Sequence, residues 1–218
     1  MKPELTPQTL QLEATKFAAI ESSYPEPSLF GVTDGKAIGT YIEQKFKAYL
    51  AKTYDFTPGN SASGIDLPSL NVDIKVTSVV QPQSSCPFKS ARQKIFGLQY
   101  GLLVFVYAKT DNSSTRTATL SFAHTLFVEA ARTADFQTTT GLNEILRNKG
   151  NEEDLIAFMR DRFLPVDDIE AMAIARQLVA AGSVETGYLT ISNALQWRLQ
   201  YGRAIREAGT VTGILRLT

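Results

Sequence analysis

The chain has 218 residues, 44% hydrophobic and 20% charged, which is ordinary for a globular protein that buries a substantial core as one domain, or as a large and a small one. Basic and acidic residues balance at 22 each, so the formal net charge is zero, which at first argues against a nucleic-acid partner. One cysteine excludes an internal disulfide framework, one histidine excludes sites that need two, and the missing signal-like or bilayer-length apolar run predicts a cytoplasmic protein without membrane contact.

The first elements are two helices and two short strands. Helical spacing of apolar residues predicts a helix over about Pro7–Glu21 and another over roughly Lys36–Lys52. Strands are expected at Gly64–Leu67 and Asn71–Val80, joined by the tight connection 68–70.

The next elements complete a sheet. After a helix expected over Lys89–Leu98, the near-continuous apolar run Gly101–Tyr107 predicts a central strand covered on both faces. A strand over about Thr117–Val128 and a helix around Gly141–Arg147 follow. Residues 1–150 are therefore expected to form an α/β core, a mixed sheet flanked by helices. His124 lies in an apolar strand, so we interpret it as structural rather than catalytic.

From residue 151 the pattern becomes helical. We expect helices at Glu152–Arg162, Asp167–Ala181 and Thr190–Ala208, then two short apolar stretches at Val211 and Ile214–Leu217. Helices followed by a short two-stranded element resemble a winged helix-turn-helix, in which one helix enters the major groove of DNA. Residues 151–218 are thus expected to be a helical region that recognises DNA, the alternative being a cap that packs on the core or builds a dimer.

Candidate chemistry lies in the strand that contains Asp73 and Lys75. Polar and apolar residues alternate there, so these two side chains share one face, about 7 Å apart along the strand. Asp66 lies seven residues before Asp73, and a hairpin can bring the two carboxylates together. The chain has other acid-x-Lys matches, at Asp34–Lys36 and Glu43–Lys45, but only Asp73–Lys75 combines an alternating strand with an acid just upstream.

Such a group of residues suits phosphodiester hydrolysis. Two adjacent carboxylates repel each other, and a hard cation such as Mg²⁺ relieves the repulsion. The cation lowers the pKa of an attacking water, and a lysine can orient that water and stabilise a pentavalent phosphate. The alternative is a solvated strand face with a surface ion pair that contributes about 0–1 kcal/mol.

The neutral net charge conceals a local basic stretch. No aspartate or glutamate occurs from residue 74 to 110, whereas five basic residues do: Lys75, Lys89, Arg92, Lys94 and Lys109. We expect Lys89, Arg92 and Lys94 to contact phosphate and Gln93 to reach base edges. The alternative is an amphipathic helix whose basic residues only keep it soluble.

The expected elements follow a recognisable order. This order is a helix with a glutamate (Glu43), a strand with an aspartate, a strand with acid-x-Lys, a basic helix and a buried strand. In this order the chain resembles the PD-(D/E)XK nuclease superfamily, and within it type II restriction endonucleases, over about Thr33–Val128. The resemblance implies a restriction-endonuclease-like core. It also implies roles for residues: Asp66 and Asp73 as metal ligands, the Ile74 carbonyl as a further ligand, Lys75 as the motif lysine and Glu43 near a second metal. Ile65 stands where the motif has proline, and the spacing from Asp66 to Asp73 is short.

The resulting expectation is a Mg²⁺-dependent endonuclease that cuts double-stranded DNA as a type II restriction enzyme, with Mn²⁺ able to substitute. A homodimer is expected, because a twofold protein matches a palindromic site. Without a P-loop or G-x-G-x-x-G stretch, no nucleotide cofactor is expected. In the helical region Gln196, Gln200 and Arg203 are expected to contact DNA. The alternatives are a repair or junction-resolving nuclease of the same fold and a non-catalytic winged-helix DNA-binding protein.

Overall fold

The computed structural model describes residues 2–59, 64–85, 90–192 and 198–218. The chain forms two compact units, each assembled from separate segments. Unit 1 comprises residues 1–84, 101–128 and 207–218, and unit 2 comprises residues 85–100 and 129–206. The boundary expected at residue 150 lies inside unit 2, and the last residues of the chain belong to unit 1.

Two long helices begin unit 1, as predicted. Helix α1 (Pro7–Glu21) has proline in its first turn, and the Thr6 side chain accepts a hydrogen bond from the Thr9 N–H. Helix α2 (Gly35–Thr53) begins at Asp34, whose carboxylate accepts from the Lys36 N–H. A short 3-10 turn, η1 (Pro27–Leu29), lies between them. Side-chain oxygens thus satisfy N–H groups that a helix start leaves unpaired.

The unit 1 sheet is mixed and has the order β1-β5-β4-β2, with β8 also pairing with β5. Its strands are β1 (Pro25–Glu26), β2 (Val72–Ser78), β4 (Gly101–Asn112), β5 (Thr117–Val128) and β8 (Ile214–Arg216). Strand β2 runs parallel to β4, with Asp73 opposite Leu102, while β4 and β5 are antiparallel and form a long hairpin. Strand β2 is the last strand in this order, so it is an edge strand and one side of its main chain is not paired with another strand of this sheet.

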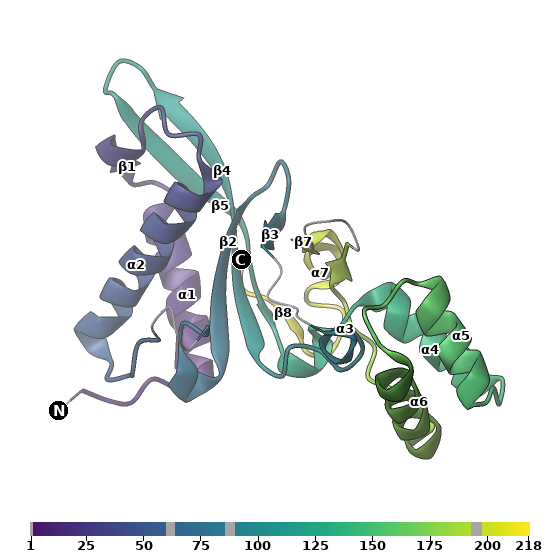
Figure 1. Ribbon diagram of the computed structural model, residues 1–218. Helices are drawn as coiled ribbons and strands as arrows, with labels where there is room; N and C mark the ends of the chain where they lie inside the picture. Colours follow the sequence, from purple (N-terminus) through teal and green to yellow (C-terminus); the bar gives the residue numbers. More distant parts are fainter. Residues whose placement is uncertain (1, 60–63, 86–89, 193–197) are drawn as a thin grey trace. The chain divides into compact units, whose positions relative to one another are not determined.

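Helices α1 and α2 cover one face of this sheet (Figure 1). Aromatic rings fill the space between them: the Phe17 and Phe46 ring centroids lie 5.0 Å apart, and the Phe46 and Phe105 centroids 5.2 Å apart. Phe46 and Phe105 are fully buried, and each such side chain contributes about 1.5–3 kcal/mol of transfer free energy. The apolar run in β4 is therefore the buried strand that the sequence predicted.

Unit 2 is mainly helical. Its helices are α3 (Ala91–Phe96), α4 (Phe136–Arg147), α5 (Glu152–Asp161) and α6 (Asp168–Ala181), and a short helix, α7 (Gly202–Glu207), runs from it into unit 1. It also has a 3-10 turn, η3 (Ala130–Arg132), and the antiparallel strands β6 (Thr190–Ile191) and β7 (Arg198–Gln200). Strand β3 (Gln83–Ser85) lies at the boundary between the units. Buried Leu142, Leu155, Met159 and Ile174 belong to one apolar core.

Two predicted elements are wrong. The strand expected at Gly64–Leu67 is a single bridge between Leu67 and Val72, followed by the 3-10 turn η2 (Pro68–Leu70). A regular hairpin is not formed because Pro68 has no N–H to donate, and the connection closes through Asn71 at φ 55° instead.

The continuous helix expected over Thr190–Ala208 is also wrong. Strands β6 and β7 occupy its described beginning and middle, and only α7 is helical; residues 193–197 lie outside the described residues. Thr190 and Ile191 are β-branched and favour strands, and the Ile191 N–H donates to the Asp135 carboxylate. The described residues of this segment therefore do not form one continuous recognition helix. Strand β8 pairs with β5, and no strand forms at Val211.

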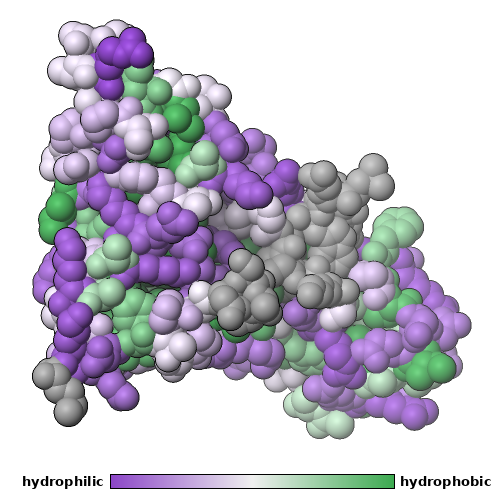
Figure 2. All heavy atoms as spheres, turned by 60° about the vertical axis from the view of Figure 1, so that its left-hand side comes forward, coloured by the Kyte–Doolittle hydropathy of each residue, from purple (hydrophilic) through white to green (hydrophobic). Residues whose placement is uncertain are grey.

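Most of the unit 1 surface seen in Figure 2 is hydrophilic, with smaller apolar patches between the polar side chains. In the described part of the chain, no helix combines the length and apolar character needed to cross a membrane.

Candidate active site

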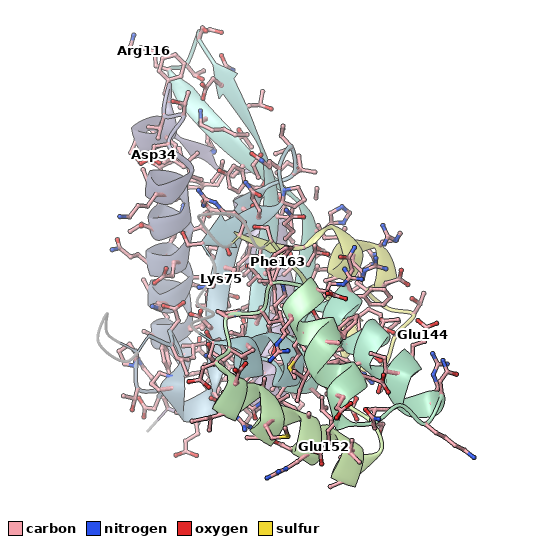
Figure 3. All side chains as sticks on the ribbon, turned by 45° about the vertical axis from the view of Figure 1, so that its right-hand side comes forward. Asp34, Lys75, Arg116, Glu144, Glu152 and Phe163 are labelled. Carbon is pink, nitrogen blue, oxygen red and sulfur yellow. The ribbon has the colours of Figure 1, made fainter. Side chains whose placement is uncertain are left out.

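Strand β2 places Asp73 and Lys75 together, as the alternation in the sequence predicted. Lys75 Nζ lies 2.6 Å from Asp73 Oδ2; the Asp73 side chain is 5% exposed and that of Lys75 is 22% exposed. Val72, which precedes Asp73, and Ile74, which lies between Asp73 and Lys75, belong to the core under the helices. Figure 3 marks Lys75 on β2, close to α2. The strand thus presents a buried carboxylate and a partly accessible ammonium side by side.

Asp66 is held against the edge of β2. Its Oδ2 accepts a hydrogen bond of 2.9 Å from the Ile74 N–H, and its carboxyl group also hydrogen-bonds that of Asp73. An edge strand has unpaired main-chain groups on one side, and the N–H and C=O of one residue point the same way. The Ile74 carbonyl therefore faces the same edge as its N–H. The expected proximity of Asp66, Asp73 and Ile74 is present in the structure.

Helix α2 contributes two further charged groups. Lys47 Nζ lies 2.8 Å from Glu43 Oε1 and 2.6 Å from Asp66 Oδ1. Glu43 and Lys47 are one helical turn apart, so both side chains lie on the same flank of α2. The Glu43 carboxyl group also hydrogen-bonds Asp66. Glu43, Asp66 and Asp73 thus form a row of carboxyl groups, in which Lys47 bridges Glu43 and Asp66 and Lys75 pairs with Asp73.

The protonation of this row is unequal. Burial, together with the hydrogen bond to Asp66, raises the pKa of Asp73 to about 6, although Lys75 opposes the rise. Burial alone would raise the pKa of Asp66 as well, but hydrogen bonds from Asp73, Lys47 and Glu43 and from the Ile74 N–H lower it to about 2. Burial and the neighbouring Asp66 raise the pKa of Glu43. Asp66 is therefore the carboxylate that stays ionised and accepts hydrogen bonds from its neighbours.

The donor set suits a hard cation. Asp66, Asp73 and the Ile74 carbonyl offer oxygen atoms, the ligands that Mg²⁺ prefers. With all carboxyl groups ionised, three negative charges and two lysines leave a formal charge of −1, which attracts a cation. No group of three acidic, histidine or cysteine side chains is arranged to hold a metal in the described residues. Glu43 is instead paired with Lys47, which the sequence interpretation did not single out. The Glu43-x-x-x-Lys47 spacing was its only signal, and such pairs are common on solvated helices.

The residues expected to contact DNA are in varied surroundings. Lys89 and Gln196 lie outside the described residues. Arg92 pairs with Glu170 and donates to Gln177 of α6, Gln93 is half-buried, and the Lys94 side chain is buried, with 3% of the residue exposed. The acid-free stretch therefore obtains at least one acidic partner from a distant segment of the chain.

The other expected contacts come from the segment that was predicted to be a helix. Gln200 ends β7 and is half-buried. Arg203 is the second residue of α7, and its guanidinium carbon lies 3.6 Å from the centroid of the Phe136 ring. A cation over an aromatic face is a stabilising contact within a protein. Both residues belong to unit 2, and Arg203 is half-buried.

His124 takes no part in the acidic row. It lies on β5, where its Nδ1 is 3.3 Å from Arg216 Nη1. Burial and the Arg216 charge lower its pKa. Its place in a central hairpin agrees with the interpretation of a structural histidine.

A mixed sheet flanked by helices, with acidic side chains and a lysine on its edge strand, has the parts of a phosphodiester-hydrolysing enzyme. The family model described as type II restriction enzyme NspV matches residues 4–216 of the chain. The type II restriction enzyme NspV of Nostoc sp. (strain ATCC 29411 / PCC 7524) is 64% identical over 211 residues, which cover 97% of this chain and 96% of that protein. No solved structure matches the chain.

The chain therefore belongs to the type II restriction enzyme NspV family. This confirms the predicted class, a type II restriction endonuclease. It also favours restriction over the repair, junction-resolving and non-catalytic alternatives.

Proposed function

We propose that the enzyme hydrolyses phosphodiester bonds of double-stranded DNA at a Mg²⁺ site formed by Asp66, Asp73 and the Ile74 carbonyl, on a PD-(D/E)XK core. One observation carries the proposal: the edge of β2 presents Asp73 beside Lys75 while its Ile74 N–H fixes the carboxylate of Asp66. A solvated strand face would not bury an aspartate to 4% exposure next to a second carboxyl group.

Each group has a role that its position supports. The bound cation supplies positive charge at the phosphate and lowers the pKa of a water molecule. Lys75, 22% exposed at the side chain, orients the attacking water and donates to a phosphate oxygen. Asp66 and Asp73 hold the cation, and the Ile74 N–H restricts Asp66 to one orientation. Buried Val72 and Ile74 anchor the strand that carries these groups.

DNA binding is proposed for the same residues that the sequence indicated. Arg92, Gln93 and Gln200 are at least partly exposed. Together with Lys89, Lys94, Gln196 and Arg203, they are our candidates to contact DNA. We also propose that the enzyme acts in the cytoplasm. We propose a homodimer, because a palindromic DNA site has the same twofold symmetry as a dimer. Light scattering of the purified protein, with and without a DNA duplex, measures the dimer.

The metal site is tested with Asp73→Asn and Lys75→Met. Incubation of plasmid DNA with the unmodified enzyme and Mg²⁺ is expected to give discrete bands, and both substitutions are expected to lower the cleavage rate at least a hundredfold. DNA binding, measured by gel shift in Ca²⁺, is expected to change little. Asp161→Asn is a matched control, because Asp161 is exposed and lies at the end of α5.

Metal binding is measured separately from cleavage. Since a ligand that binds only the folded state stabilises it, Mg²⁺ or Mn²⁺ is expected to raise the Tm of the unmodified enzyme and to raise it less for Asp73→Asn. Intact DNA across varied sequences and divalent ions would refute nuclease activity. An equal rise of the Tm in the unmodified enzyme and in Asp73→Asn would instead show that the metal binds elsewhere.

A further inference from the structure

Lys47 occupies the space between two carboxyl groups of the proposed site. Its Nζ lies 2.6 Å from Asp66 Oδ1 and 2.8 Å from Glu43 Oε1, and its side chain is only 18% exposed. Asp66 offers its other oxygen to the Ile74 N–H, so Lys47 and the main chain hold the carboxylate from two sides. The Lys47 ammonium group therefore lies inside the cluster and forms ion pairs with both Glu43 and Asp66.

The neighbouring lysines of α2 are placed differently. Lys45 pairs with Glu21 and lies over the Tyr24 ring, and Lys52 is exposed. Positions two residues apart on a helix point about 200° away from each other, so Lys45 and Lys47 lie on different flanks of α2, and only Lys47 is directed to the flank that carries Glu43 and faces Asp66.

Charge and space both argue against a second divalent ion beside Asp66 and Glu43. Three carboxylates, two lysines and one divalent ion sum to a formal charge of +1, whereas a second ion would bring the sum to +3 in a partly buried site. An ammonium within 3 Å of both carboxylates already supplies positive charge there. Two cations so close together repel strongly at the low effective dielectric of a protein.

We propose that Lys47 is a positioning residue that takes the place of a second metal ion, so that each active site binds a single divalent cation at Asp66 and Asp73. Lys47 holds Asp66 in its ligand orientation and neutralises Glu43. The inference rests on the proposed function, since it concerns the same site.

The experiment counts bound Mn²⁺ per chain by electron paramagnetic resonance and isothermal titration, without DNA. We expect one Mn²⁺ for the unmodified protein and two for Lys47→Met, because the substitution frees Glu43 and one oxygen of Asp66 as ligands. Lys52→Met, on the same helix, removes an equal charge from an exposed position and is expected to leave the count at one. Adding Glu43→Gln to Lys47→Met is expected to return the count to one.

The possible failures are distinguishable. No bound Mn²⁺ in the unmodified protein overturns the proposed metal site itself. Two ions in the unmodified protein, or a single ion in folded Lys47→Met, overturns only the role of Lys47. Should Lys47→Met fail to fold by circular dichroism, Lys47→Gln retains a polar side chain without the charge, and the same count decides.

Discussion

Glu13 shows at the scale of a single residue how the fold of unit 1 depends on charge. Its carboxylate is 7% exposed and accepts hydrogen bonds from Lys16 Nζ at 2.8 Å, from the Tyr49 hydroxyl at 2.6 Å and from the Tyr54 hydroxyl at 3.2 Å. Burial would raise the pKa of Glu13, but these hydrogen bonds and the Lys16 charge together lower it. Helix α1 is thus tied to α2 by an ionised group.

The lowered pKa of Glu13 predicts acid sensitivity. The folded state binds the proton more weakly than the unfolded chain, so ionised Glu13 stabilises the fold above the unfolded pKa of about 4.3. This contribution is lost as the pH falls through the folded pKa. Glu13→Gln is therefore expected to lower the free energy of unfolding at pH 7 and to make it less dependent on pH below 5, measured by urea denaturation. Glu144→Gln, at an exposed position of α4 (Figure 3), is the control; equal pH slopes for unmodified and Glu13→Gln protein would contradict the prediction.

At the scale of elements, periodicity was sufficient where one face of an element is buried. The bounds of α1 and β5 agree with the predicted ranges, and the alternation in β2 predicted the neighbouring Asp73 and Lys75. Periodicity failed over Thr190–Ala208, where apolar spacing suited a helix but β6 pairs with β7 and the Ile191 N–H donates to Asp135, which lies much earlier in the chain. It also could not show that Lys47 reaches Asp66, because that contact depends on how the loop before β2 packs against α2.

Asp135 accepts hydrogen bonds from two elements, α4 and β6. One carboxylate oxygen accepts from the N–H and hydroxyl of Thr138 at the start of α4, and the other accepts from the Ile191 N–H of β6. Asp135→Ala removes a helix cap and leaves a buried N–H unpaired, so we expect a loss of about 2–4 kcal/mol in the free energy of unfolding.

The matched control for Asp135 is Asp167→Ala, which removes the cap of α6 without unpairing a strand, with an expected loss of about 1 kcal/mol. Urea denaturation measures both changes. Hydrogen exchange is expected to show faster opening at residues 190 and 191 for Asp135→Ala alone, and similar exchange in the two variants would refute the link between α4 and β6.

At the scale of the whole molecule, the chain passes twice from unit 1 into unit 2 and returns each time, finally at residue 207. Residues 207–218 belong to unit 1, although the change to a helical pattern after residue 150 predicted that they would continue a separate region. Composition could not show the return, because β8 has only three residues, Ile214–Arg216. The pairing of these residues with β5 is a long-range contact that no local pattern specifies.

The return predicts that the C-terminal segment is part of the unit 1 fold. Ile214 is fully buried and pairs with Val128, and the Leu217 N–H donates to the Thr125 carbonyl. Ile214→Ala is therefore expected to lower the free energy of unfolding by about 2–5 kcal/mol, whereas Thr210→Ala, at an exposed position of the preceding turn, should cost less than about 1 kcal/mol. Hydrogen exchange locates the effect: protection should fall at residues 125–128 in Ile214→Ala. A variant that ends at residue 208 should lose β5 protection as well, and unchanged protection there would show that β8 is dispensable.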